Sequence, residues 1–120
     1  MIQRRYRRAV EWTKQTMKLS TVGTIIAIRK LTLSDQRTVT VRVGKPRRFR
    51  GGNDDYYCPY QILGLGDEVV RYAGGVDPVQ ALQLALVAIG ADLGALKEAK
   101  TGTLSWAAGS TKGDFGFPRH

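Results

Sequence analysis

The sequence predicts an α+β fold, with an antiparallel sheet of about five strands and one main helix, at residues 78 to about 96, packed on one face. Two observations lead to this class. Short runs rich in β-branched residues alternate with turn residues over residues 23–73, which is typical of antiparallel strands. A single longer stretch then places apolar residues three and four positions apart, the spacing of one helical face.

The first two strands are expected to form a hairpin. Residues 23–33 make its first arm, Ser34, Asp35 and Gln36 supply the turn, and residues 38–43 make its second arm. The second arm alternates strictly between apolar and polar positions. Its core-facing residues should be Val39, Val41 and Val43, while Thr38, Thr40 and Arg42 should face outward or line a second surface.

The rest of the sheet is expected from shorter runs. Residues 44–46 should end the second arm, because Pro46 cannot donate to a strand ladder, and residues 44–55 read as a loop. Residues 57–63 and 68–73 are expected to be the third and fourth strands, and residues 103–106 a last short one. The glycine-rich tail after residue 109 should bring Phe115 and Phe117 back onto the body of the domain.

The helix has a well-defined start. Asp77 is placed as its N-cap, Pro78 as its first residue and Gln80 at the third position, which together make a capping-box pattern. The apolar stripe consists of Val79, Leu82, Leu86, Ile89, Leu93 and Leu96, with Ala81, Ala85 and Ala88 allowing close approach to a sheet. This stripe is interpreted as core, with a partner-binding groove as the alternative.

Positive charge is concentrated in the first 50 residues. They hold 14 of the 19 lysines and arginines and two of the 10 acidic residues of a chain whose net charge is +9. Such asymmetry favours contact with a polyanion: nucleic acid, an anionic membrane surface or an acidic protein. The cations form two clusters beside aromatic residues: Arg4, Arg5, Arg7 and Arg8 with Tyr6 and Trp12, and Lys45, Arg47, Arg48 and Arg50 with Phe49. This combination suits phosphate contact and base stacking, but a solvated basic surface is the alternative, since no known nucleic-acid reader motif accompanies it.

Residues 1–18 are interpreted as a basic N-terminal segment and residues 19–120 as a single domain. Apolar positions spaced by three and four predict a short basic helix over residues 2–18. No membrane span is expected, because the most apolar stretch, residues 81–91, is about half the roughly 20 residues that a span needs. A single cysteine fits a reducing cytoplasm.

Candidate catalytic residues are few, and no catalytic residue, metal or cofactor is assigned. The one histidine, His120, is terminal, and one His with one Cys cannot make an ordinary His/Cys metal site. Cys58 is interpreted as a buried strand residue rather than a reactive thiol. The acidic residues Asp54, Asp55, Asp67 and Glu68 fall in expected turns, so an enzyme is favoured only if Asp54, Asp55 and Asp67 converge in a deep pocket.

Five segments together resemble a family of small bacterial proteins known as a domain of unknown function, over roughly residues 38–118. They are residues 39–46, 55–62, 72–77, 81–86 and 113–118. The resemblance implies a single cytoplasmic domain from bacteria, and it supplies no catalytic residues. The arginine-rich first 18 residues lie outside it.

The sequence therefore favours a non-enzymatic binding module of the bacterial cytoplasm that acts on a protein partner. An immunity-like or inhibitor-like role belongs to this class on small size alone. The module would use an open sheet face and the loop around residues 47–50, with Tyr56, Tyr57 and Tyr60 either as interface anchors or as core residues. The alternative is a nucleic-acid-binding protein that contacts phosphates through the two basic clusters.

Overall fold

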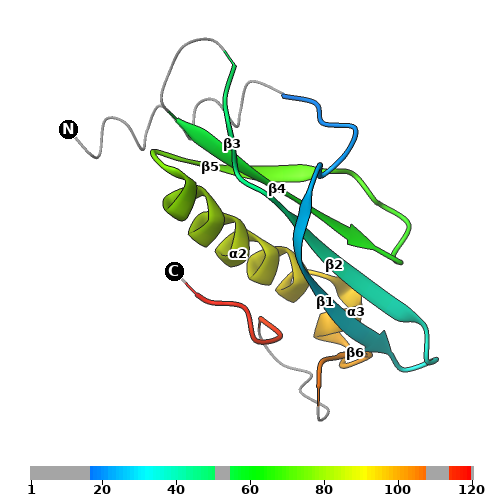
Figure 1. Ribbon diagram of the computed structural model, residues 1–120. Helices are drawn as coiled ribbons and strands as arrows, with labels where there is room; N and C mark the ends of the chain where they lie inside the picture. Colours follow the sequence, from blue (N-terminus) through cyan, green and yellow to red (C-terminus); the bar gives the residue numbers. More distant parts are fainter. Residues whose placement is uncertain (1–16, 51–54, 108–113, 120) are drawn as a thin grey trace.

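The computed structural model describes residues 17–50, 55–107 and 114–119 (Figure 1). Within them one antiparallel sheet of six strands carries the main helix along one face, which confirms the α+β class. The basic helix expected over residues 2–18 lies almost wholly outside the described residues, and Met17 and Lys18 are not helical.

Four strands follow one another across the sheet as a meander. They are β1 (Ile25–Leu33), β2 (Thr38–Gly44), β4 (Tyr56–Leu63) and β5 (Arg71–Gly75), each antiparallel to the one before. After the helix, β6 (Leu104–Ser105) pairs with the end of β1 at the other side of the sheet. The expected hairpin is confirmed. The fourth strand starts at residue 71 instead of 68, because Glu68 belongs to the preceding loop, where its carboxylate accepts a 2.9 Å hydrogen bond from the N–H of Gly64.

The expected loop at residues 44–55 contains a further strand, β3 (Arg47–Arg48). It pairs with the same edge of β4 as β2 does, with Val43 opposite Tyr60 and Arg47 opposite Tyr57. Arg47 comes four residues after Val43, whereas Tyr57 comes only three before Tyr60. The extra residue makes the chain bulge at Lys45 and Pro46. A bulge accommodates the missing N–H of Pro46, and the strand resumes after it. The second strand therefore ends at Gly44, as expected from Pro46, but the expected loop after it contains a strand that pairs with β4 again.

Side chains on the helix face of the sheet form the core. The fully or almost fully buried residues of this face include Leu31, Leu33, Val39, Val41, Val43, Cys58, Tyr60 and Leu104. The predicted inward alternation of the three valines is therefore confirmed. Each directly opposite pair in an antiparallel sheet shares a face, so the intervening residues must point to the other side.

The helix α2 (Pro78–Gly94) begins as expected. The side chain of Asp77 accepts a 2.8 Å hydrogen bond from the N–H of Gln80, and the Gln80 side chain accepts a 2.7 Å bond from the N–H of Val76, one residue before the cap. A methyl group on Gly75 would overlap the main-chain nitrogen of Ala81, so glycine is needed for the first turn to lie against β5.

The apolar stripe of α2 differs from the expected one. Val79 is 63% exposed, whereas Ala81, Ala85, Ile89 and Leu93 are completely buried. Two residues correspond to about 200° around a helix, so Val79 lies opposite Ala81 and cannot share its contacts with the sheet. The helix also ends at residue 94 rather than about 96, and a short helix, α3 (Lys97–Lys100), follows it.

The C-terminal tail packs back onto the domain, as expected. Phe115 is completely buried and Phe117 nearly so. Arg29 of β1 holds this tail: its guanidinium lies 4.2 Å from the ring centre of Trp106 and 4.6 Å from that of Phe117, and it donates a 3.3 Å hydrogen bond to the carbonyl of Phe115.

Candidate binding surface

The face of the sheet opposite α2 is the main candidate for a binding surface, and we call it the open face. The strand register places on it the side chains of Ile28, Lys30, Thr40, Arg42, Arg47, Tyr57, Gln61, Leu63 and Tyr72. No helix of the described chain covers this face (Figure 1). Residues 17–23 cross one end of it, near Gly44 and Pro59, and leave the part around Arg42 uncovered.

The open face is positively charged. Lys30 on β1 and Arg47 on β3 are exposed, and Arg42 on β2 is half-buried and donates a 3.4 Å hydrogen bond to Gln61. Among the described strand residues that point to this face, none is acidic. The face therefore presents cations without internal neutralisation by neighbouring strand residues.

Arg47 lies beside a pocket of about 300 Å³ between the sheet and residues 18–23, with Lys18 and Tyr57 among the other residues that line it. The ring centre of Tyr57 lies 5.2 Å from that of Phe49 and 5.9 Å from that of Tyr72. These three rings therefore form one cluster at the end of the open face. Two cations line this pocket together with the hydroxyl residues Ser20 and Thr21, and the rest of its wall is largely apolar. This arrangement suits a carboxylate or a phosphate oxygen.

The structure separates the second basic cluster instead of keeping it together. Arg47 and Arg48 are consecutive in β3 and therefore point to opposite faces. Arg48 lies 5.7 Å from the ring centre of Tyr56, on the helix side. Lys45 and Arg50 are exposed at the two ends of this short strand. Arg4, Arg5, Arg7 and Arg8 lie outside the described residues.

Two aromatic residues considered for the surface are buried. Phe49 is 3% exposed and Tyr60 is 4% exposed, so neither is available to a partner. Tyr60 is instead a core residue whose hydroxyl donates a 2.7 Å hydrogen bond to Asp92 of α2. Tyr56 and Tyr57 are half-buried. Of the three candidate tyrosines, only Tyr57 lies on the open face.

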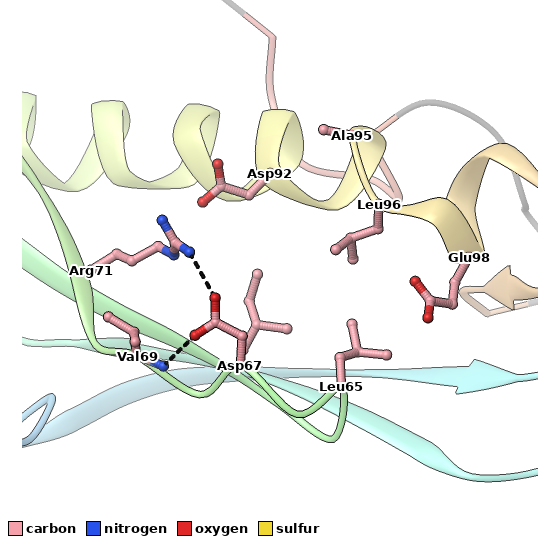
Figure 2. Close-up of a pocket in the computed structure, with 9 residues that line it drawn as sticks. Leu65, Asp67, Val69, Arg71, Asp92, Ala95, Leu96 and Glu98 are labelled. Atoms are coloured by element: carbon pink, nitrogen blue, oxygen red, sulfur yellow. Dashed lines mark hydrogen bonds and ion pairs between the residues drawn. The ribbon is translucent and has the colours of Figure 1, made fainter.

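Of the acidic residues considered for catalysis, the two that the structure describes, Asp55 and Asp67, lie at opposite ends of β4. Asp55 is buried just before β4, whereas Asp67 is exposed in the loop at the far end of β4, and Asp54 lies outside the described residues. Asp67 forms a 3.3 Å ion pair with Arg71 (Figure 2). In the described ranges no three His, Cys, Asp or Glu side chains gather as metal ligands would.

The pocket in Figure 2 has a volume of about 240 Å³ and lies between the β4–β5 loop and the end of α2. Its floor is apolar, with Leu65 and Leu96 facing each other, and its acidic groups already have partners in two cases. Asp67 pairs with Arg71, and Asp92 accepts the hydroxyl of Tyr60. Of the described residues that the enzyme interpretation required, Asp67 lines this pocket and Asp55 does not.

Cys58 is completely buried on β4, as its interpretation as a structural residue requires. Its thiol donates to the carbonyl of Gly44 at 3.3 Å, and burial raises its pKa to about 12. A thiol with such a pKa holds its proton at neutral pH and is a poor nucleophile. His120 lies outside the described residues.

Lys30, Ile28 and Leu63 were not identified as surface residues from the sequence. The period-two alternation of the strands was the signal that could have found them, since it already placed Arg42 and Thr40 on an outward or second surface. What the alternation lacked was the register between strands. Only the register brings Ile28 opposite Arg42 and Lys30 opposite Thr40.

The fold and this surface define a small α+β domain with a basic sheet face that no helix of the described residues covers. The chain belongs to the family described as Domain of unknown function (DUF6968), whose model matches residues 27–119. The resemblance to an uncharacterised family is therefore confirmed, and the match begins earlier in the chain than expected. No curated protein and no solved structure matches the chain. Among the described residues, no helix is both long and apolar enough to cross a membrane.

Proposed function

We propose that this protein is a non-enzymatic binding module that recognises an acidic surface of another protein through the open face of its sheet. One observation supports this most: Lys30, Arg42 and Arg47 share that face, and no acidic strand residue of the described chain shares it with them. An inhibitor-like or immunity-like role is one form of this function. The setting that we propose is the bacterial cytoplasm, in line with the resemblance to bacterial proteins and with a single free thiol.

The mixture of side chains favours a protein partner. The exposed Ile28 lies directly opposite Arg42, and Leu63 lies directly opposite Thr40, so apolar groups are interspersed with the cations. Protein interfaces combine such apolar contact with arginine, whereas a groove that tracks a phosphate backbone is dominated by positive charge. The open face is therefore suited to a surface with both carboxylates and apolar groups.

Nucleic-acid binding is a second candidate, because Arg47 lies opposite Tyr57 and Arg48 lies beside the ring of Tyr56. Cations next to rings can combine phosphate contact with base stacking. The ring of Tyr57, however, contacts Phe49 and Tyr72, which leaves it less surface for a base. We place this candidate second for that reason.

Anisotropy titrations with labelled oligoglutamate and with labelled single- and double-stranded oligonucleotides, over a salt series, separate the two candidates. We expect the double variant Arg42→Gln/Arg47→Gln to weaken oligoglutamate binding. Lys97→Gln/Lys100→Gln removes the same charge from α3 and should leave it unchanged. Equal effects of the two variants would contradict the proposal. Oligonucleotide binding that persists near physiological salt, and whose salt dependence flattens on loss of Arg47, Arg48 and Arg50, would favour nucleic acid.

A further inference from the structure

Within the described residues, the outer edge of β1 is unpaired over much of its length. β6 pairs only with Thr32 and Leu33, and no strand of the described chain pairs with residues 25–29 on that side. The N–H of Leu33 donates to Arg37 in the hairpin. Bonding alternates along an antiparallel strand, so residues 31, 29 and 27 also bond to β2, and the N–H and C=O of Ile28 point outward. An unpaired edge is a template for another strand.

This same edge carries most of the exposed large apolar side chains. Ile25 is 36% exposed, Ile26 47% and Ile28 56%. The only other exposed large apolar residues among those described are Val69 and Val79, which are ten residues apart in the sequence. A bulge in the β1–β2 pairing lies at Ile25–Ala27 and shifts the register there by one residue. Natural edge strands are commonly protected by charge or proline. Here three of the four residues at positions 25–28 are exposed isoleucines.

A groove runs beside the edge on its helix side. It has a volume of about 170 Å³ and is bounded by β1, α2 and the C-terminal tail, through residues that include Ala27, Leu86, Phe117 and Pro118. Arg29 also lines it, and its guanidinium is held over the rings of Trp106 and Phe117. The rest of the lining is almost entirely apolar, so the groove suits an aliphatic side chain.

We infer that residues 25–29 bind an extended, acidic segment of a partner protein, which adds to the sheet as a strand beside β1. Residues of that segment opposite Ala27 would place apolar side chains in the groove. Residues opposite Ile28 would place acidic side chains over the open face, near Lys30 and Arg42. The acidic character of the bound segment rests on the proposed function. The backbone pairing with β1 and the groove do not involve Arg47, so they can be tested separately from it.

The probe is a capped heptapeptide in which valine and glutamate alternate. Its binding is monitored through the amide chemical shifts of the isotope-labelled full chain. In the proposed pairing the glutamate N–H groups face β1 and the valine N–H groups face away. We expect saturable shifts at Ile26 and Ile28. N-methylation of the glutamates should abolish the shifts, and N-methylation of the valines should retain them.

Two substitutions of Ile28 test whether its main-chain N–H is needed for binding the peptide. Ile28→Pro removes the outward N–H and should weaken binding at least about tenfold, whereas Ile28→Thr keeps that N–H and should retain binding. If Ile28→Pro does not fold, the two N-methylated peptides still decide the question. Equal binding of both peptides would overturn strand addition and leave charge recognition by the open face intact. The absence of shifts at Ile26 and Ile28 at millimolar peptide would also overturn it. Concentration-dependent shifts of these amides without peptide would assign the edge to a second copy instead.

Discussion

Tyr60 of β4 donates its hydroxyl proton to the carboxylate of Asp92 on α2 over 2.7 Å, which fastens the helix to the sheet from inside the core. Tyr60 is almost completely buried, and this burial, together with the bond to Asp92, holds the pKa of its hydroxyl well above the usual range. The hydroxyl is therefore protonated at neutral pH and can donate to Asp92.

Tyr60→Phe should lower the free energy of unfolding by about 1–3 kcal/mol, because it leaves the half-buried carboxylate of Asp92 without this donor. Urea denaturation measures the loss. Tyr56→Phe is the matched control, since its hydroxyl makes only a 3.5 Å contact with Arg48 and should cost less. Equal losses from the two substitutions would show that the bond to Asp92 adds nothing.

Val79→Glu should leave stability unchanged or raise it by about 0.3–1 kcal/mol. Val79 is exposed in the first turn of α2, which contains no acidic residue, and a carboxylate there interacts favourably with the helix dipole. Thermal unfolding at low ionic strength measures the effect. A loss of several kcal/mol would show that Val79 packs in the core, as the helical stripe in the sequence suggested.

The discrepancy at Val79 shows how far periodicity reaches. Spacings of three and four identified a helix and most of its inner face, and the capping pattern of Asp77 and Pro78 identified its start. The spacings did not show which side of this broad apolar face meets the sheet. Large apolar residues lie on one side of it and alanines on the other, and either side could pack against strands. The close contact of Gly75 with the helix start favours the alanine side, and that contact depends on tertiary structure.

Cys58 should react slowly with a thiol reagent in the native state up to about pH 9. Burial raises its pKa from the ordinary 9.0 to about 12, so the folded protein disfavours the thiolate. The corresponding stability is fully present below pH 9 and is lost as the pH rises towards 12. Reaction rates with and without denaturant measure this. Fast reaction of the native protein at pH 8 would contradict the burial of this residue.

Arg29→Lys should loosen the C-terminal tail, because lysine keeps the charge but not the planar group that lies over Trp106 and Phe117. We expect a loss of about 1–2 kcal/mol and faster amide exchange at Phe117. Arg37→Lys is the control, since the Arg37–Asp35 pair is exposed and should matter little. If amide exchange at Phe117 were unchanged in Arg29→Lys, the packing of the tail would not depend on the arginine.

The candidate binding surface was less predictable than the fold. Arg42 was expected to face outward, but its neighbours Ile28 and Lys30 on β1 become a group with it only through the strand register. Arg47 and Arg48 read as one cluster because residues 44–55 looked like a loop. The bulge at Pro46 lets the strand resume, and strand geometry then sends the two side chains to opposite faces.

The most direct test of the open face as a binding surface is to map the amide shifts of the full chain as oligoglutamate is added at moderate salt. We expect the shifts to concentrate on residues of the open face, especially Lys30, Arg42 and Gln61, and to disappear in Arg42→Gln/Arg47→Gln. Shifts centred on the lysines of α3, or spread evenly over all basic residues, would contradict recognition through this face.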